Sequence, residues 1–286
     1  MSESPTAALV LGFILAAIIA LIGWKLNALS FSGAVGAVLI GGFVFGLGGP
    51  TWAAVMIAFF VASSALSRVG RNHKARNRHI EKSGARDLIQ TLANGGVALL
   101  MALIVGLVGH KSPEYPYLTL AYFGSLAAAT ADTWATEIGL LSPRPPRLIT
   151  TGQPTSPGIS GGVTPLGLIG SLAGGAFIGF TAFSTIQMAS LLTTGTWFLQ
   201  DAFLLLTVPT AGFLASLFDS FLGATVQRLY YCERCQTATE KKIHTCGTPT
   251  RPIRGIVWMN NDAVNFLATC VGAIVAPLLS LPFLVS

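Results

Sequence analysis

Three carboxylates lie inside stretches that otherwise have the composition of membrane-spanning segments. Asp132 and Glu137 occur in "GSLAAATADTWATEIG" (124–139), and Asp219 occurs in "GFLASLFDSFLGATVQR" (212–228). An acidic residue near the centre of a bilayer costs about 2.5–3.5 kcal/mol, and intramembrane acids usually mark ion, proton or substrate sites. We therefore predict a functional site here. The alternative is an internal hydrogen bond or a shared proton that only fixes the packing of helices.

Small residues accompany these acids at helical spacing, which predicts that neighbouring helices approach closely at the site. Glu137 lies five positions after Asp132, about 140° around an ideal helix. Both acids can line one cavity only if several helices surround them or the helix breaks. The two stripes comprise Gly124, Ala128, Asp132, Ala135 and Gly139 in the first segment, and Gly212, Ser216, Asp219, Gly223 and Gln227 in the second.

Further polar residues occur where other apolar segments begin. Asp87 and Asn94 lie in "ARDLIQTLANGG", and Asp262 lies among three asparagines in "MNNDAVN". The segment "TGQPTSPGISGGVTPLGLIGSLAGG" (151–175) can turn backbone N–H groups towards an anion, and the following helix N-terminus adds a favourable dipole. The alternative for this segment is a flexible loop followed by close glycine packing.

Carboxylate oxygens beside a phosphate-binding loop suit Mg²⁺ better than a soft metal. A carboxylate-bound Mg²⁺ that bridges phosphate oxygens is the usual arrangement for phosphoryl transfer. We predict Asp132, Glu137 and Asp219 as magnesium ligands.

Soft ligands are concentrated elsewhere, in "YCERCQTATEKKIHTCG". Cys232, Cys235, His244 and Cys246 form a C-x2-C-x8-H-x-C pattern. Four such ligands can close a tetrahedral structural zinc site, although the spacing differs from that of common zinc fingers, and free thiols remain the alternative. The basic residues of this loop predict that it faces the cytoplasm, where disulfides rarely form. The loop at about 228–259 is thus a candidate zinc-binding loop within a single membrane domain, 1–286.

The composition of the chain is that of a polytopic membrane protein. Of its 286 residues 52% are hydrophobic and only 10% are charged, and the mean hydropathy is +0.67. We predict an all-α integral membrane bundle of about eight spans, with a range of six to eight. The second and third spans are short enough to form a re-entrant hairpin instead, and the seventh has room for a break. The predicted spans are 7–24, 33–48, 51–67, 89–110, 117–140, 160–183, 198–227 and 262–285.

The distribution of basic residues predicts the orientation. With eight spans, 16 of the 17 lysines and arginines fall on one side, and only Lys111 falls on the other. The positive-inside rule places that basic side in the cytoplasm and both termini outside. The expected contacts of these residues are anionic lipid headgroups and phosphates, and we predict no nucleic-acid partner. The absence of a transit-peptide composition favours a bacterial or archaeal plasma membrane.

Five segments resemble the transmembrane protein 19 family of integral membrane proteins, which includes the plant phytyl-phosphate kinase. They are "RDLIQTLANGGVA", "ADTWATEIG", "SGGVTPLGLIGSLAG", "FDSFLGATVQ" and "WMNNDAVNF", and they occur in order between about residues 25 and 280. The resemblance implies an all-helical membrane enzyme that phosphorylates an isoprenoid monophosphate to the diphosphate with a nucleoside triphosphate.

The resemblance also supplies the candidate site residues. Asp87, Asp132, Glu137 and Asp219 are predicted to be catalytic. The residues predicted to bind substrate or phosphate are Arg86, Asn94, Thr133, Gly161, Gly162, Thr164, Gly223, Asn261, Asp262 and Asn265. Two other functions stay open: a cation- or proton-coupled transporter, in which the acids bind the ion, and a non-catalytic membrane scaffold.

Overall fold

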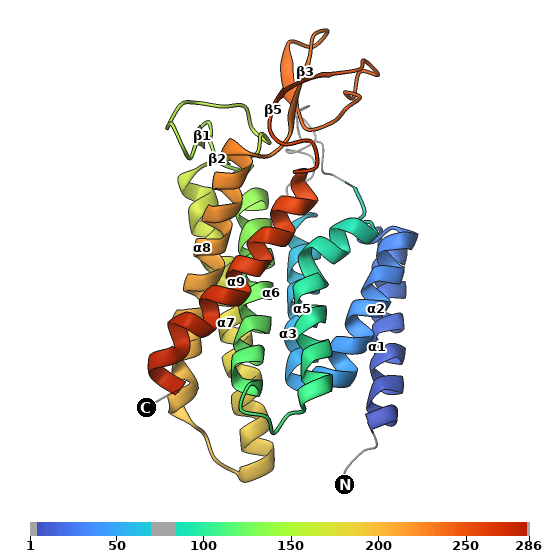
Figure 1. Cartoon of the computed structure of the whole chain (residues 1–286), viewed down its shortest axis with the longest axis vertical. Coiled ribbons are helices and arrows are strands. Elements are labelled where there is room, and N and C mark those ends of the chain that lie inside the picture. The colour runs from blue at the N-terminus through green and yellow to red at the C-terminus, as the bar shows by residue number, and fades with distance from the viewer. Residues whose placement is uncertain (1–4, 70–83, 285–286) are drawn as a thin grey trace.

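The computed structural model describes residues 5–69 and 84–284. Five predicted cytoplasmic basic residues, Arg71, Lys74, Arg76, Arg78 and Lys82, lie outside the described part. Within it the chain forms eight α-helices (Figure 1). They are α1 (Pro5–Lys25), α2 (Phe31–Gly48), α3 (Pro50–Leu66), α5 (Leu88–Val108), α6 (Tyr115–Gly139), α7 (Pro165–Thr194), α8 (Leu204–Thr225) and α9 (Asn261–Leu284).

These helices make the protein an all-α polytopic membrane bundle, as the composition predicts. Six of the described helices are long and apolar enough to cross a membrane. The other two, the 17-residue α3 and the acid-bearing α6, run alongside them (Figure 1). The chain turns back at each helix end, so its first and last described residues lie at the same end of the bundle. Lipid leaves no water to satisfy the backbone, and helices satisfy it internally.

The helices form two groups that lie side by side. The N-terminal group consists of α1, α2, α3 and α5, and the C-terminal group consists of α6 to α9 (Figure 1). Helix α6 contacts members of both groups, and twelve consecutive residues of it, from Leu120 to Ala131, are buried. A helix that is buried on every side is central to the core. One link between the groups joins α3 to α6: Trp52 stacks on Tyr122, whose hydroxyl donates to the Trp52 carbonyl oxygen at 2.6 Å.

Small residues allow the helices of the C-terminal group to touch through their backbones. A Cβ added to Gly124 of α6 would lie 2.1 Å from the carbonyl oxygen of Gly272 in α9. A Cβ added to Gly212 of α8 would lie 2.9 Å from the carbonyl oxygen of Ala127 in α6. This is the close approach that the small-residue stripes predict.

Some predicted boundaries need correction. The sixth span occupies Pro165–Thr194 and not 160–183, because the Thr164 hydroxyl caps its first turn by accepting from Gly167 N at 2.9 Å. The seventh segment has no break: a short 3₁₀ helix η1 (Leu199–Phe203) continues directly into α8. Helices α2 and α3 are 18 and 17 residues long, about 25–27 Å each, so α2 is long enough to be a candidate span and α3 falls just short of that length.

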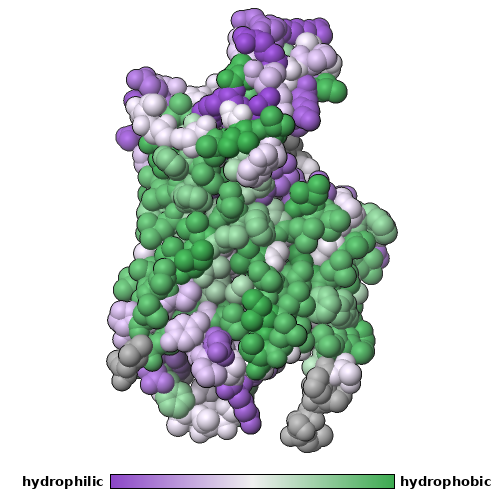
Figure 2. Space-filling view, viewed as in Figure 1, coloured by the Kyte–Doolittle hydropathy of each residue, from purple (hydrophilic) through white to green (hydrophobic). Residues whose placement is uncertain are grey.

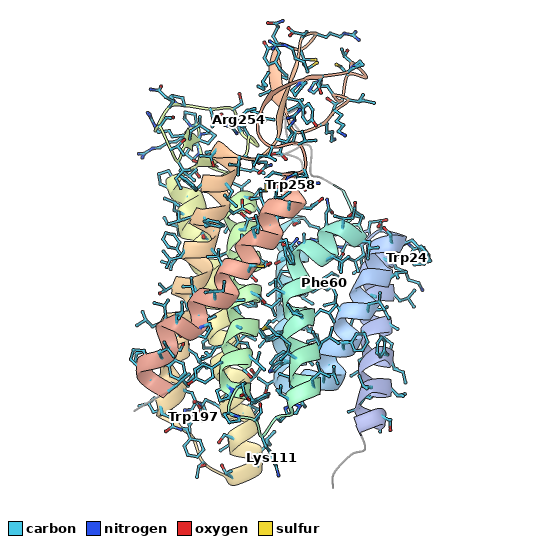
Figure 3. The ribbon with its side chains drawn as sticks, viewed as in Figure 1. Trp24, Phe60, Lys111, Trp197, Arg254 and Trp258 are labelled. Atoms are coloured by element: carbon cyan, nitrogen blue, oxygen red, sulfur yellow. The ribbon has the colours of Figure 1, made fainter. Side chains whose placement is uncertain are left out.

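Five short strands lie at one end of the described part of the bundle. Strands β1 (Arg147–Leu148) and β2 (Gly162–Val163) pair in one hairpin, and β3 (Leu229–Cys232), β4 (Thr237–Thr239) and β5 (Arg251–Arg254) form a sheet of order β4-β3-β5. Both lie at the end opposite the termini (Figure 1). We call this the basic end, because strand β5 carries Arg251 and Arg254 there (Figure 3). Lys111 lies at the opposite end.

The surface divides into the zones expected of a membrane protein. Hydrophobic residues cover the middle of the bundle and hydrophilic residues gather at its two ends (Figure 2). Trp24 and Trp258 are exposed near the basic end, and Trp197 is exposed at the other (Figure 3). Tryptophans favour the two membrane–water interfaces.

Candidate functional site

A cavity of about 920 Å³ lies within the basic end, and we call it the polar cavity. Its walls are formed by the basic-end parts of α3, α5, α6, α8 and α9, together with the turn after α1 and the segment that precedes α7. Of the fourteen site residues predicted from the sequence, eleven line it. They are Arg86, Asn94, Asp132, Thr133, Glu137, Gly161, Gly162, Thr164, Asp219, Asn261 and Asn265.

Asp132 and Glu137 line the same cavity although they point in different directions from α6. The helix is continuous from Tyr115 to Gly139, so no break brings the two acids together. Instead the cavity wraps around the last turns of α6, which several helices surround. Asp219 reaches the cavity from α8, so the three predicted magnesium ligands come from two helices.

The acids lie well inside the bundle. Asp132 is seven residues before the last residue of α6, and Asp219 is six residues before the last residue of α8. At 1.5 Å per residue these positions are about 10 Å and 9 Å from the helix ends. Both acids therefore lie in the half of the bundle nearer the basic end.

Arg86 is a fixed positive charge in the cavity wall. Its backbone pairs with the segment just before α2, since Arg86 N donates to Ala28 O and Ser30 N donates to Arg86 O, each at 3.0 Å. Burial lowers the pKa of Arg86, and the nearby carboxylate of Glu137 opposes that shift. An arginine stays protonated in either case. Arg86 therefore supplies a permanent cation beside an acid of the site.

The glycine segment before α7 packs directly on the end of α8. Gly161 has a φ of +86°, and a Cβ there would lie 2.4 Å from Ala224 N. A Cβ on Gly223 would lie 2.8 Å from Gly161 N, so Gly223 permits this approach without lining the cavity. Gly162 N donates to Ile159 O at 3.2 Å, so this N–H is used within the loop. The segment thus forms a fixed wall next to Asp219.

Two other predicted residues lie outside the cavity lining. Asp87 is exposed and caps α5: its carboxylate accepts from Gln90 N at 2.9 Å, and the Gln90 side chain accepts from Asp87 N at 3.3 Å. This reciprocal capping box stabilises the start of α5, so Asp87 has a structural role. Asp262 lies in the first turn of α9, where a negative charge is favourable.

The structure adds lining residues that the sequence analysis did not select. Gln90 and Ser216 both line the polar cavity. Helical spacing could have identified both residues. Gln90 precedes the predicted site residue Asn94 by one helical turn, and Ser216 belongs to the stripe that contains Asp219. Arg68 and Arg144 add positive charge to the lining.

A second cavity of about 70 Å³ lies within the N-terminal group, and we call it the apolar slot. Most of its lining consists of apolar residues of α1, α2 and α3, such as Ala20, Ile40 and Phe60. Along α2 it extends from Ala37 to Phe45, about 12 Å. Figure 3 shows Phe60 within this group. The two cavities share three lining residues: Arg86, Gln90 and Asn94.

The four predicted zinc ligands lie together at the basic end, outside the helical bundle. Cys232 ends strand β3, and Cys235, His244 and Cys246 follow it in the loop. One ligand atom from each residue lies within 4.8 Å of those of the others. The spacing in the sequence therefore does bring the four side chains to one point.

Fold and cavities together define a multi-pass integral membrane protein with a charged cavity at one end. The chain belongs to the family described as integral membrane protein DUF92, whose model matches residues 14–273. That range includes every residue that lines the two cavities.

Relatives occur in plants, archaea and cyanobacteria. The chain is 31% identical to Protein PGR of Arabidopsis thaliana over 278 residues, 94% of each chain. It is 28% identical to an uncharacterized membrane protein of Methanocaldococcus jannaschii, over 92% of this chain and 90% of the relative. An uncharacterized membrane protein of Synechocystis is 26% identical over 78% of this chain and 71% of the relative. No solved structure matches the chain.

Proposed function

We propose that the protein is a membrane-embedded kinase that transfers a phosphoryl group from a nucleoside triphosphate to an isoprenoid monophosphate. The resemblance to the transmembrane protein 19 family suggests this reaction. The observation that carries the proposal is the junction of the polar cavity and the apolar slot at Arg86, Gln90 and Asn94. An isoprenoid phosphate has the same two parts, a charged head and a hydrocarbon chain. A substrate without a hydrocarbon part would leave the apolar slot unoccupied.

The polar cavity has the groups that phosphoryl transfer requires. Asp132, Glu137 and Asp219 are hard oxygen ligands suited to Mg²⁺, which neutralises phosphate charge during transfer. Arg86 lies at the junction, where it would bind the monophosphate of the lipid. The volume of the polar cavity, about 920 Å³, lies within the range of sites that enclose small-molecule ligands. Catalysis of this kind consists of positioning and charge stabilisation.

The apolar slot matches the first part of an isoprenoid chain. A water-sized group needs roughly 10–15 Å³ of such space, so about 70 Å³ accommodates roughly five to seven such groups. A space of this size suits a short hydrocarbon segment comparable to a single isoprene unit. We propose that the slot binds the unit next to the phosphate, and that the rest of the chain continues between the helices towards lipid.

We further propose that the basic end faces the cytoplasm of a bacterial or archaeal plasma membrane. The positive-inside rule supports this orientation, and nucleoside triphosphates are available on that side. Cysteines introduced at exposed Lys242 and Thr193, at opposite ends, test it. Lys242→Cys should react only with a reagent inside the cell and Thr193→Cys only with one outside, above the wild-type background. The reverse pattern would overturn the orientation.

The reaction itself is tested with purified protein, Mg²⁺, a panel of isoprenoid monophosphates and each nucleoside triphosphate. Mass analysis of the lipid should detect the diphosphate with at least one pair of substrates. No diphosphate with any pair would overturn the proposal.

The depth of Asp132, about 10 Å inside α6, also suits a cation- or proton-coupled transporter. Proteoliposomes distinguish the two functions. An ion flux that Asp132→Asn abolishes, without diphosphate formation by the wild type, would favour the transporter.

A further inference from the structure

We propose that Cys232, Cys235, His244 and Cys246 bind one structural zinc ion, and that this ion holds the three-stranded sheet against the wall of the polar cavity. The proposal does not depend on the kinase activity. It rests on the geometry of the cluster, on the composition of the sheet and on a chain of hydrogen bonds from the sheet to the cavity.

The distances between the four side chains suit a tetrahedral ion. A zinc ion with Zn–S bonds of about 2.3 Å has ligands about 3.8 Å apart along each edge of the tetrahedron. The Sγ atoms of Cys232 and Cys246 are 3.7 Å apart, and His244 Nδ1 is 3.2 Å from Cys246 Sγ. A disulfide needs about 2.05 Å between its sulfurs, so the first distance is far too long for one.

The chemistry of the donor set selects zinc and a structural role. Sulfur and imidazole nitrogen are the ligands that tetrahedral zinc takes in proteins, in sets such as three cysteines and one histidine. Four protein ligands also leave no position open for water or substrate. The ion would therefore hold structure and would not carry out the chemistry of the polar cavity.

Apart from Leu229 and Tyr230, the sheet has few buried apolar residues besides the zinc ligands. Its strands contain four, three and four residues, and most of β5 is exposed. Two of the ligands, Cys232 and His244, are among its most buried residues, at 0% and 7% exposure. Apolar Ile243 and Ile253 point to solvent instead. A substructure this small usually needs a metal or disulfides for stability, because its apolar core is insufficient.

Hydrogen bonds connect the sheet to the cavity wall. Glu240 lies between Cys235 and His244 in the chain, and its carboxylate accepts a hydrogen bond from the Ser160 hydroxyl. Ser160 lines the polar cavity just before Gly161, and it also accepts from Gln227 Nε2 at 2.9 Å. From β5, Arg254 Nη2 donates to Gly223 O at 2.7 Å. Zinc that fixes the loop would thus also fix Ser160 and the glycine segment.

Metal analysis of the purified full-length protein tests the site. Elemental mass spectrometry should find one zinc per chain in the wild type. Cys270→Ser is the matched control, because Cys270 lies in α9 away from the cluster, and it should retain one zinc. Cys235→Ser, which changes the most exposed ligand, should lower the zinc content at least fivefold. Full zinc content in Cys235→Ser would remove that residue from the site and overturn the proposal.

A measurement on the wild type covers the case in which ligand variants fail to fold. A thiol reagent should modify Cys232, Cys235 and Cys246 slowly in the purified protein and at least tenfold faster after treatment with a zinc chelator. The rate of zinc release should equal the rate at which the three thiols become reactive. Wild-type protein without zinc, and with three reactive thiols from the start, would overturn the proposal.

Limited trypsin digestion tests the connection to the cavity wall. Removal of zinc should raise the rate of cleavage after Arg147, in the hairpin that holds the glycine segment, about tenfold. Cleavage after Lys111, at the opposite end, should not change. Glu240→Gln should retain zinc and raise cleavage after Arg147 to a smaller extent. Equal cleavage after Arg147 with and without zinc would contradict the positioning role.

Discussion

The polar cavity and the apolar slot share three residues of one chain segment but have opposite linings. The polar cavity lies mainly in the C-terminal group and contains three carboxylates and several arginines. The apolar slot lies in the N-terminal group and is lined by aliphatic and aromatic side chains. The two helix groups thus provide separate environments, one for charge and one for hydrocarbon, and the start of α5 joins them.

The sequence explains why the two groups differ. In the C-terminal group, glycine and alanine let α6, α8 and α9 approach closely, and this brings the acids of α6 and α8 to one cavity. In the N-terminal group, glycines such as Gly12 and Gly46 also bring α1 and α2 into close contact, but larger side chains such as Ile40, Phe45 and Phe60 line a narrow apolar space beside them. Substitutions confined to one region should therefore have effects that differ from those of substitutions in the other.

The largest effect is expected from the acids of the polar cavity. Asp132→Asn and Asp219→Asn keep size and most hydrogen bonding but remove a charge, so both proteins should fold. Turnover of the proposed kinase should fall about 10³-fold, because a magnesium ion that neutralises the transferring phosphoryl group would lose one of its carboxylate ligands. Glu114→Gln is the control, since Glu114 is exposed and follows Lys111, which lies at the opposite end, by three residues in the chain. Near-normal phosphorylation by either Asp variant would refute the magnesium assignment.

A smaller loss is expected at the junction. Arg86→Lys keeps the charge but removes the planar donor group that binds phosphate with two parallel hydrogen bonds. We expect kcat/KM for the isoprenoid phosphate to fall about 30-fold, with little change in the KM for the triphosphate. Arg144→Lys, at an exposed position of the cavity lining, should stay within about twofold. Equal effects of the two changes would mean that Arg86 has no special position at the junction.

Variants in the apolar slot should alter selectivity more than rate. Phe60→Ala enlarges the slot and Phe60→Trp narrows it, so the ratio of kcat/KM between bulky and slender isoprenoid phosphates should shift in opposite directions, by about fivefold each. Phe180→Ala serves as control, because Phe180 is 62% exposed on α7. The comparison fails if the Phe60 variants leave the ratio unchanged.

The smallest effect is expected at Asp87. Serine also caps helices, so Asp87→Ser should keep activity within about twofold, whereas Asp87→Ala should lower the free energy of unfolding by about 1 kcal/mol. Thermal unfolding and turnover measure the two quantities. A loss of turnover in Asp87→Ser as large as that in Asp132→Asn would restore the catalytic role predicted from the sequence.

The fold was predictable because a membrane imposes long apolar helices, and that prediction is confirmed. The start of α7 was misplaced, since Gly161 and Gly162 have the composition of a span but lie in a loop packed on α8. The cysteine cluster was predictable because its ligands lie close together in the chain. The site roles and both metals stay predictions.

The apolar slot could not be predicted, because its lining comes from four helices and no local pattern records how they pack. For the same reason, spacing alone did not separate Asp87, which caps a helix, from the acids of the cavity. A titratable residue at a helix start has the same sequence signature whether it caps the helix or binds a ligand.

Photo-crosslinking tests most directly whether one amphiphilic phosphate occupies both cavities. The probe is an isoprenoid monophosphate with a photoreactive group on its first isoprene unit, and peptide mass spectrometry locates the bond. We predict crosslinks to slot residues of α2 and α3, such as Ile40 and Phe60, that an excess of unlabelled isoprenoid monophosphate abolishes and inorganic phosphate does not. Crosslinks confined to lipid-facing positions such as Phe180, and unaffected by the competitor, would contradict the account.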